Sequence, residues 1–131
     1  MDKTILVDAV DTFVIEIEGK FKIFKEMHDL LETFPNKKII LTNANDEQLK
    51  KFNLENLPYE IFTLKHNPDK IDPEYFKKML EHFALKPEDV VYFEHNAKAV
   101  ESAKSLGVTS FYYDPDKKDL EALKSFLNGN L

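Results

Sequence analysis

Short apolar runs that alternate with helical stretches constrain the fold of this chain more than any other feature. The strand-like runs cover residues 4–7, 38–41, 59–64, 90–93 and 108–112. The helical stretches cover residues 25–34, 46–52, 73–83, 97–106 and 116–127. Apolar strands that alternate with helices are typical of a parallel sheet covered on both faces. The sequence therefore predicts a three-layer, doubly wound, Rossmann-like α/β fold with about five parallel strands.

Local signals add detail to this prediction. The segment FVIEIEGKFKIF, residues 13–24, alternates apolar and polar residues around Gly19, which predicts a β-hairpin after the first strand. For the helix at 73–83, Asp72 is expected to be the N-cap residue and Pro73 the first helical residue. Asp116 is expected to cap the last helix in the same way.

Length and composition exclude several classes of protein. The 131 residues are expected to form one domain, 1–131. The absence of cysteine excludes disulfide scaffolds, thiolate zinc sites and thiol nucleophiles. The 24 acidic residues outnumber 18 lysines, and there is no arginine, which argues against duplex nucleic acid as a partner. The first apolar run is too short for a signal peptide or a membrane span, so we expect a soluble, cytoplasmic protein with no membrane partner.

Polar residues follow the predicted strands where such sheets bind ligands. In parallel α/β sheets the ligand site lies beyond the carboxyl ends of the strands. A carboxylate that accepts a phosphoryl group needs a neutralising cation, hydrogen-bond donors and usually Mg²⁺. The residues at these ends, or in the loop before the helix at 73–83, are Asp8, Thr42, Asn43, Lys70, Glu94 and His95.

In this arrangement the chain resembles the haloacid dehalogenase (HAD) superfamily, whose members are mostly Mg²⁺-dependent phosphohydrolases. ILVDAVDTF resembles the first motif, a strand followed by Asp-x-Asp-x-Thr, and IILTN resembles the second, a strand ending in Ser or Thr. KIDPEYF resembles the third motif, a Lys before a helix. VVYFEHN followed by AVESAKSLG resembles the fourth, an acidic strand end before a helix and Gly.

The resemblance implies a role for each matching residue. Asp8 would be the nucleophile that forms an aspartyl-phosphate, assisted by Thr42 and Lys70. Asn43 and Thr12 would bind the substrate. The expected cofactor is Mg²⁺, and its ligands would be Asp8, the main-chain carbonyl of Val10, Glu94 and His95.

The chain departs from the family pattern at two motifs. The second acid of the first motif, which serves as general acid and base, is replaced by Val10, which has no proton to transfer. Asp11 is the nearest replacement and is retained as a catalytic candidate, although an extended backbone would point its side chain away. The usual Asp of the fourth motif is replaced by Glu94, with His95 beside it.

The spacing of the motifs leaves no room for a cap domain. Residues 9–41 hold only the hairpin, one helix and a strand, and residues 43–69 hold only a short helix and a strand. Family members without a cap have open sites that act on large substrates or are covered by a partner or a second copy. We therefore expect a phosphorylated substrate, a protein partner over the site or a homodimer.

Three functions remain possible at this point. The first is a HAD-like phosphohydrolase with weak or lost activity, and the second is a non-catalytic module that keeps the fold for binding or oligomerisation. The third is a receiver-type signalling domain, but the positions of its phosphorylated Asp and its Lys hold residues 63–66 and 113–115, which do not match. Each motif residue taken alone has an ordinary explanation as a turn, cap or surface residue.

Overall fold

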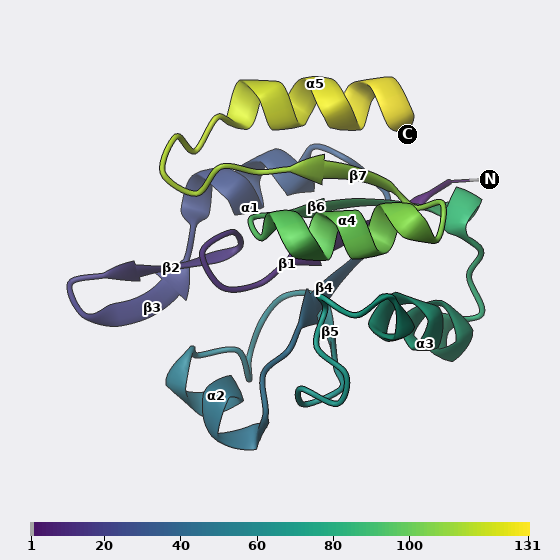
Figure 1. Cartoon of the computed structure of the whole chain (residues 1–131). Helices are drawn as coiled ribbons and strands as arrows, with labels where there is room; N and C mark the ends of the chain where they lie inside the picture. The colour runs from purple at the N-terminus through teal and green to yellow at the C-terminus, as the bar shows by residue number, and fades with distance from the viewer. Residues whose placement is uncertain (1) are drawn as a thin grey trace.

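Five parallel strands form the centre of the computed structural model, which describes residues 2–131 (Figure 1). Their order across the sheet is β5-β4-β1-β6-β7. The chain therefore moves outward from β1 in one direction and then, with β6, in the other. This reversal makes the end of β1 a switch point, which is where doubly wound sheets form their ligand crevice. The strands are β1 (Thr4–Asp8), β4 (Lys38–Thr42), β5 (Glu60–Thr63), β6 (Val90–Glu94) and β7 (Thr109–Tyr112).

Helices cover both faces of the sheet, as the sequence predicted. Helices α1 and α5 pack on one face, and α3 and α4 pack on the other (Figure 1). A short α2 stands beyond the carboxyl end of β4. The helices are α1 (Lys25–Glu32), α2 (Asp46–Lys51), α3 (Pro73–Phe83), α4 (Ala97–Ser105) and α5 (Leu120–Asn130).

The two layers of core follow from the alternation of side chains along β1. Ile5 and Val7 point to the face covered by α1 and α5, whereas Leu6 points to the face covered by α3 and α4. All three side chains are fully buried. Because both faces of this strand are buried, it is an unbroken apolar run rather than an alternating one.

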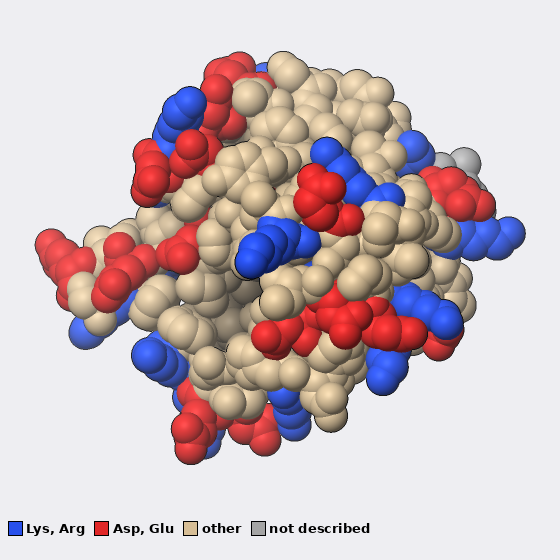
Figure 2. Space-filling view, in the orientation of Figure 1, with Lys and Arg blue, Asp and Glu red and all other residues tan. Residues whose placement is uncertain are grey.

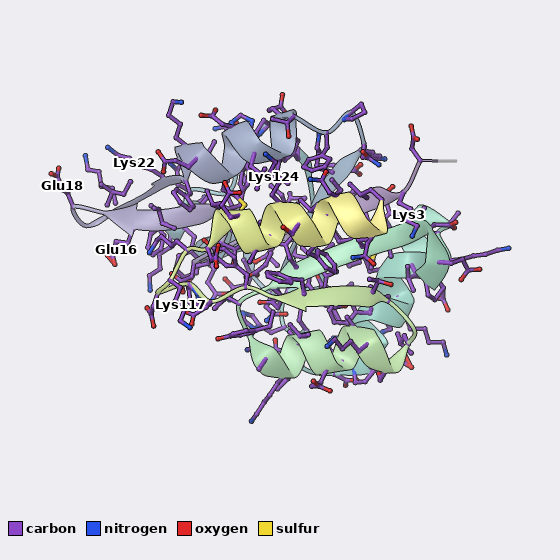
Figure 3. The ribbon with its side chains drawn as sticks, turned by 90° about the horizontal axis from the view of Figure 1, so that it is seen from above. Lys3, Glu16, Glu18, Lys22, Lys117 and Lys124 are labelled. Atoms are coloured by element: carbon purple, nitrogen blue, oxygen red, sulfur yellow. The ribbon has the colours of Figure 1, made fainter. Side chains whose placement is uncertain are left out.

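The predicted hairpin is confirmed and projects beyond the layers. It pairs β2 (Val14–Ile17) with β3 (Lys20–Ile23) through a turn in which Glu18 and Gly19 have φ of 52° and 80°. Two left-handed residues in a two-residue loop match the twist of the flanking strands. Glu16, Glu18 and Lys22 lie on the part of the hairpin that extends past the sheet (Figure 3).

The start of the last helix is the main error in the predicted elements. Helix α5 begins at Leu120, and the side chain of Asp119 rather than Asp116 caps it by accepting a hydrogen bond from Ala122 N at 3.0 Å. Asp114 accepts the main-chain N–H of Asp116 at 2.9 Å and so holds the preceding residues in a turn.

Charged side chains of both signs are interspersed on the displayed face, with a hollow between the hairpin and the region of α2 (Figure 2). Figure 1 places the carboxyl ends of the central strands beside this hollow. None of the helices within residues 2–131 has the length and apolar character needed to cross a bilayer.

Candidate active site

A cavity of about 150 Å³ opens at the carboxyl ends of β1, β4 and β6. The sequence predicted polar residues at this edge, and the structure brings most of them together. The predicted residues that line the cavity are Asp8, Val10, Thr42, Asn43, Lys70, Glu94 and His95.

Asp8 ends β1 at the base of the cavity, and a tight turn of the following chain holds its carboxylate. Ala9 O accepts the main-chain N–H groups of Phe13 at 2.8 Å and Val14 at 3.0 Å, which folds the chain back. This turn brings Thr12 beneath the strand end, where its hydroxyl donates to Asp8 Oδ2 at 2.7 Å. Asp8 is therefore buried with a fixed orientation.

Lys70 joins the two acidic strand ends. Its ammonium donates to Asp8 Oδ1 and to Glu94 Oε1, both at 2.7 Å, and to Leu41 O at 3.2 Å. Its side chain is only 6% exposed. An ammonium buried to this degree between two carboxylates forms strong charge-assisted hydrogen bonds.

His95 lies against both carboxylates from the start of the loop before α4. Its Nδ1 is in hydrogen-bond contact with Asp8 Oδ2 and lies 3.3 Å from Glu94 Oε2. Its main-chain N–H also donates to Asp8 Oδ2 at 3.3 Å. The other oxygen of Glu94 accepts from the buried hydroxyl of Tyr92, and Oε2 accepts the main-chain N–H of Asn96 at 3.0 Å.

These contacts determine the charge of the site. Burial raises the pKa of Asp8, but the nearby Lys70 and His95 outweigh burial and hold that pKa well below its usual range. Burial lowers the pKa of Lys70, but Asp8 and Glu94 outweigh it and raise that pKa above the ordinary value. Burial also lowers the pKa of His95, yet its hydrogen bonds with Asp8 and Glu94 raise it to about 10. The base of the cavity thus holds an ionised Asp8 beside an ammonium and a protonated imidazole.

The end of β4 positions the loop that carries Lys70. The Asn43 side-chain oxygen accepts the main-chain N–H of Lys70 at 2.7 Å. Thr42 Oγ1 accepts the main-chain N–H of Ala44 at 3.2 Å, so its own hydroxyl proton stays available as a donor. The buried hydroxyl of Tyr75 donates to Thr42 O at 2.9 Å and connects α3 to this strand end.

Two of the predicted site residues, Thr12 and Asp11, do not line the cavity. Thr12 is fully buried beneath Asp8, so it orients the carboxylate rather than lining the cavity. Asp11 adopts a left-handed backbone with φ of 68°, and its side chain is 55% exposed. Its Oδ2 lies 3.8 Å from His95 Nε2 and does not line the cavity, where Val10 stands instead. The turn after Asp8 does not re-aim Asp11 toward the Asp8 carboxylate.

Sequence reasoning missed several residues of the cavity. Tyr92 supports Glu94 from within β6, a position that an apolar strand pattern does not distinguish from ordinary core. His66 lies in a loop where no periodicity indicates its direction, and its place four residues before Lys70 is the one sequence signal for proximity to the site. The lining residues outside the predicted set are Ala44, Gln48, Phe52, His66, Asn96 and Ala99.

A group of three residues in this site has the donors for a divalent cation. Each of Asp8, Glu94 and His95 offers a ligand atom, and these atoms lie within 4.8 Å of one another. Carboxylate oxygens suit Mg²⁺, and an imidazole nitrogen suits transition metals. The residues present therefore fit a divalent cation, and His95 adds a nitrogen donor to the oxygen donors once its ring has released its proton.

Comparisons with known proteins agree with this geometry. The family model of haloacid dehalogenase-like hydrolases matches residues 5–113. The chain belongs to this family. The match includes all four motif segments that surround the cavity, so the HAD resemblance inferred from the motifs is confirmed.

Individual HAD relatives show how far the similarity extends. A phosphorylated carbohydrates phosphatase from Thermotoga maritima is 30% identical over 121 residues, which cover 80% of this chain and 56% of that protein. The chain thus spans little more than half the length of this curated relative.

Solved HAD structures share the fold at low sequence identity. A HAD family enzyme from Bacteroides thetaiotaomicron, solved as a magnesium complex, has a TM-score of 0.72 and 13% identity over 93% of this chain and 98% of that one. The N-terminal part of a Bacteroides fragilis protein that contains a phosphatase domain, complexed with Mg, has a TM-score of 0.69 and 13% identity. That match covers 98% of this chain and 40% of the other. Magnesium is thus the metal found in these HAD neighbours.

Proposed function

We propose that this HAD-family chain is a slow phosphohydrolase that forms an aspartyl-phosphate on Asp8. The observation that carries the proposal is the buried Asp8 carboxylate, held ionised at 2.7 Å from Lys70 and facing a cavity of about 150 Å³. An ionised carboxylate in a fixed orientation is an activated nucleophile. The similarity to a phosphorylated carbohydrates phosphatase supports phosphorylated sugars as the substrate class.

The proposed reaction has two displacements at phosphorus. An Asp8 oxygen attacks the phosphorus atom, and the bond to the leaving oxygen breaks, so that this oxygen departs with the bonding electrons and takes up a proton. Water then attacks the phosphorus and loses a proton to solvent while the bond between phosphorus and the Asp8 oxygen breaks, which releases inorganic phosphate and restores the Asp8 carboxylate. Lys70, the Thr42 hydroxyl and the Asn43 amide are placed to hold the phosphoryl oxygens.

The cofactor of this proposal is Mg²⁺, held by Asp8, Glu94, His95 and the main-chain carbonyl of Val10. When bound, the ion neutralises negative charge on the phosphoryl group. Among the protein's own groups, Lys70 neutralises the carboxylates, and Thr12 fixes the attacking oxygen.

The proposed turnover is slow because no acidic side chain lines the cavity at position 10 to transfer protons. Val10 stands in the cavity where a family member would carry the general acid and base, and Asp11 lies outside the cavity. Loss of general acid–base catalysis typically costs about 10²–10⁴-fold in rate.

A non-catalytic binding module is the second candidate. In its favour, both oxygens of Glu94 already accept hydrogen bonds from protein donors, which are Lys70, Tyr92 and Asn96. Such a module would keep the phosphate site and lose turnover. Under either function we propose one domain without a cap, whose open site a partner or a second copy of the chain covers.

Phosphate release with Mg²⁺ separates the two functions. We expect p-nitrophenyl phosphate and a sugar phosphate to be hydrolysed slowly by the protein and not by Asp8→Asn. Equal rates for the two proteins would contradict the phosphohydrolase. Phosphate binding that persists without turnover would then support the binding module.

A further inference from the structure

One wall of the cavity is built from residues that the phosphoryl chemistry does not use. Gln48 and Phe52 come from α2 and its end, and His66 comes from the loop between β5 and α3. They line the same cavity as Asp8 and Lys70. A phosphate ester bound with its phosphorus at Asp8 must direct its leaving group toward the remaining walls.

Hydrogen bonds at both ring nitrogens fix the imidazole of His66. Nδ1 lies 2.7 Å from Asp69 Oδ1, and Nε2 lies 2.5 Å from Gln48 Oε1. The Gln48 oxygen also accepts the main-chain N–H of Asn45 at 3.0 Å as part of a capping box at the start of α2. The amide orientation is therefore set, and the ring is held between α2 and the Lys70 loop.

The backbone that carries this ring is strained. Lys65 and His66 both lie in the left-handed region, with φ of 54° and 67°. Residues other than glycine pay an energetic cost there, and such conformations cluster at ligand sites, where surrounding contacts compensate. The contacts of His66 with Asp69 and Gln48 supply this compensation while they place the ring in the cavity wall.

Phe52 gives the same wall an apolar surface. Its ring is half-buried, and the ring of Phe21 from the hairpin packs edge-on against it, with centroids 4.9 Å apart at 84°. The wall therefore combines an aromatic ring with an amide and an imidazole. A carbohydrate presents the complementary chemistry, because it has apolar C–H faces edged by hydroxyl groups.

We propose that Gln48, Phe52 and His66 form a leaving-group subsite for the polyhydroxylated part of a sugar phosphate, with His66 as the specificity-determining residue. This inference rests on the proposed phosphohydrolase function, since it assigns the phosphoryl group to Asp8 and Lys70. The ring of Phe52 contacts the C–H face of the sugar. Hydroxyl groups of the sugar accept hydrogen bonds from the side-chain N–H groups of Gln48, whose amide His66 holds in a fixed orientation, and the His66 ring shapes the wall beside them.

Binding measurements on a non-hydrolysing background test the subsite. Asp8→Asn is titrated calorimetrically with glucose 6-phosphate and with inorganic phosphate, alone and combined with His66→Asn. Asn is tolerated in the left-handed region, so the loop is preserved while the ring is lost. We expect the second substitution to weaken glucose 6-phosphate by roughly 3- to 10-fold and to change inorganic phosphate less than about twofold.

Control variants separate the subsite from a folding defect. His82→Asn, on the exposed side of α3, should change neither affinity, and Phe52→Leu should weaken only glucose 6-phosphate. Equal losses for both ligands, or no loss for glucose 6-phosphate, would overturn the subsite. Because turnover is not measured, selective loss on a protein without phosphatase activity would support the subsite and contradict only the phosphohydrolase.

Discussion

The Asp8 carboxylate illustrates how single residues create the site. Its two oxygens accept hydrogen bonds from Lys70, Thr12 and the main chain of His95, so a buried charge is fully compensated. Burial of a charge without such partners is strongly unfavourable. The same contacts that stabilise the fold therefore keep Asp8, the proposed nucleophile, ionised.

Removal of the buried ammonium tests this compensation. Lys70→Met should lower the free energy of unfolding by about 3–5 kcal/mol, because Asp8 and Glu94 lose their shared counter-charge inside the protein. Urea denaturation measures the change. Lys77→Met on the exposed side of α3 is the matched control and should stay within about 0.5 kcal/mol of the parent. Similar stabilities for the two variants would show that Lys70 is not required to balance these charges.

An acid introduced at position 10 tests the proposal that turnover is slow because Val10 stands there. Val10→Asp should raise the rate of phosphate release by roughly 10²–10⁴-fold, because this side chain lines the cavity beside Asp8. Val10→Asn has nearly the same shape as the Asp variant but no titratable proton, and it should stay near the parent rate. An unchanged rate in the Asp variant would place the limitation elsewhere.

The strand-end residues of the site could be predicted from sequence, whereas the cavity walls could not. Asp8, Thr42 and Glu94 follow buried strands, and topology alone brings such ends together. His66 and Phe52 reach the cavity through a left-handed loop and the end of a short helix, where no periodicity indicates direction. Asp11 lies outside the cavity, as its one-residue offset in the sequence had indicated, although a left-handed turn rather than an extended backbone places it there.

At the scale of elements, the order of strands and helices followed from apolar periodicity, but the ends depended on competing caps. The sequence from Asp114 to Asp119 contains three aspartates that could each begin a helix. Asp114 holds the N–H of Asp116 in a turn, and Lys118 takes a left-handed conformation with φ of 48°. These local hydrogen bonds delay α5 until Leu120.

A pair of alanine variants tests which aspartate caps α5. Asp119→Ala should cost about 1 kcal/mol of unfolding free energy, because the N–H of Ala122 loses its side-chain acceptor. Asp116→Ala, a few residues earlier, should cost less than about 0.5 kcal/mol. Thermal or chemical denaturation compares the two variants, and a larger cost at Asp116 would contradict the observed cap.

At the scale of the whole molecule, the layered fold brings several charged side chains together at one site, in a chain whose net charge is −6. Two buried acids, one lysine and one histidine share the carboxyl ends of the central strands. The chain has no arginine, so Lys70 and a bound cation carry the recognition of phosphate in the proposed function.

The effect of Mg²⁺ and phosphate on the unfolding temperature tests whether the two ligands share this site. Mg²⁺ together with inorganic phosphate should raise the unfolding temperature by more than the sum of their separate effects, because each ligand offsets the charge of the other in one site. At 100 times the dissociation constant, binding adds about 2.7 kcal/mol. Glu94→Gln removes one donor of the cation group and should weaken the Mg²⁺ effect, and chelation should reverse it. Additive effects of the two ligands would contradict a shared site.

Direct detection of a phosphorylated Asp8 tests the central claim. The protein is incubated with Mg²⁺ and acetyl phosphate, whose good leaving group needs little protonation, then quenched in acid and mapped by mass spectrometry. Because position 10 holds no acid or base, we expect water attack to be slow, so that one phosphoryl group accumulates on Asp8 and Asp8→Asn carries none. An unmodified Asp8, or a phosphoryl group on another residue, would contradict the account.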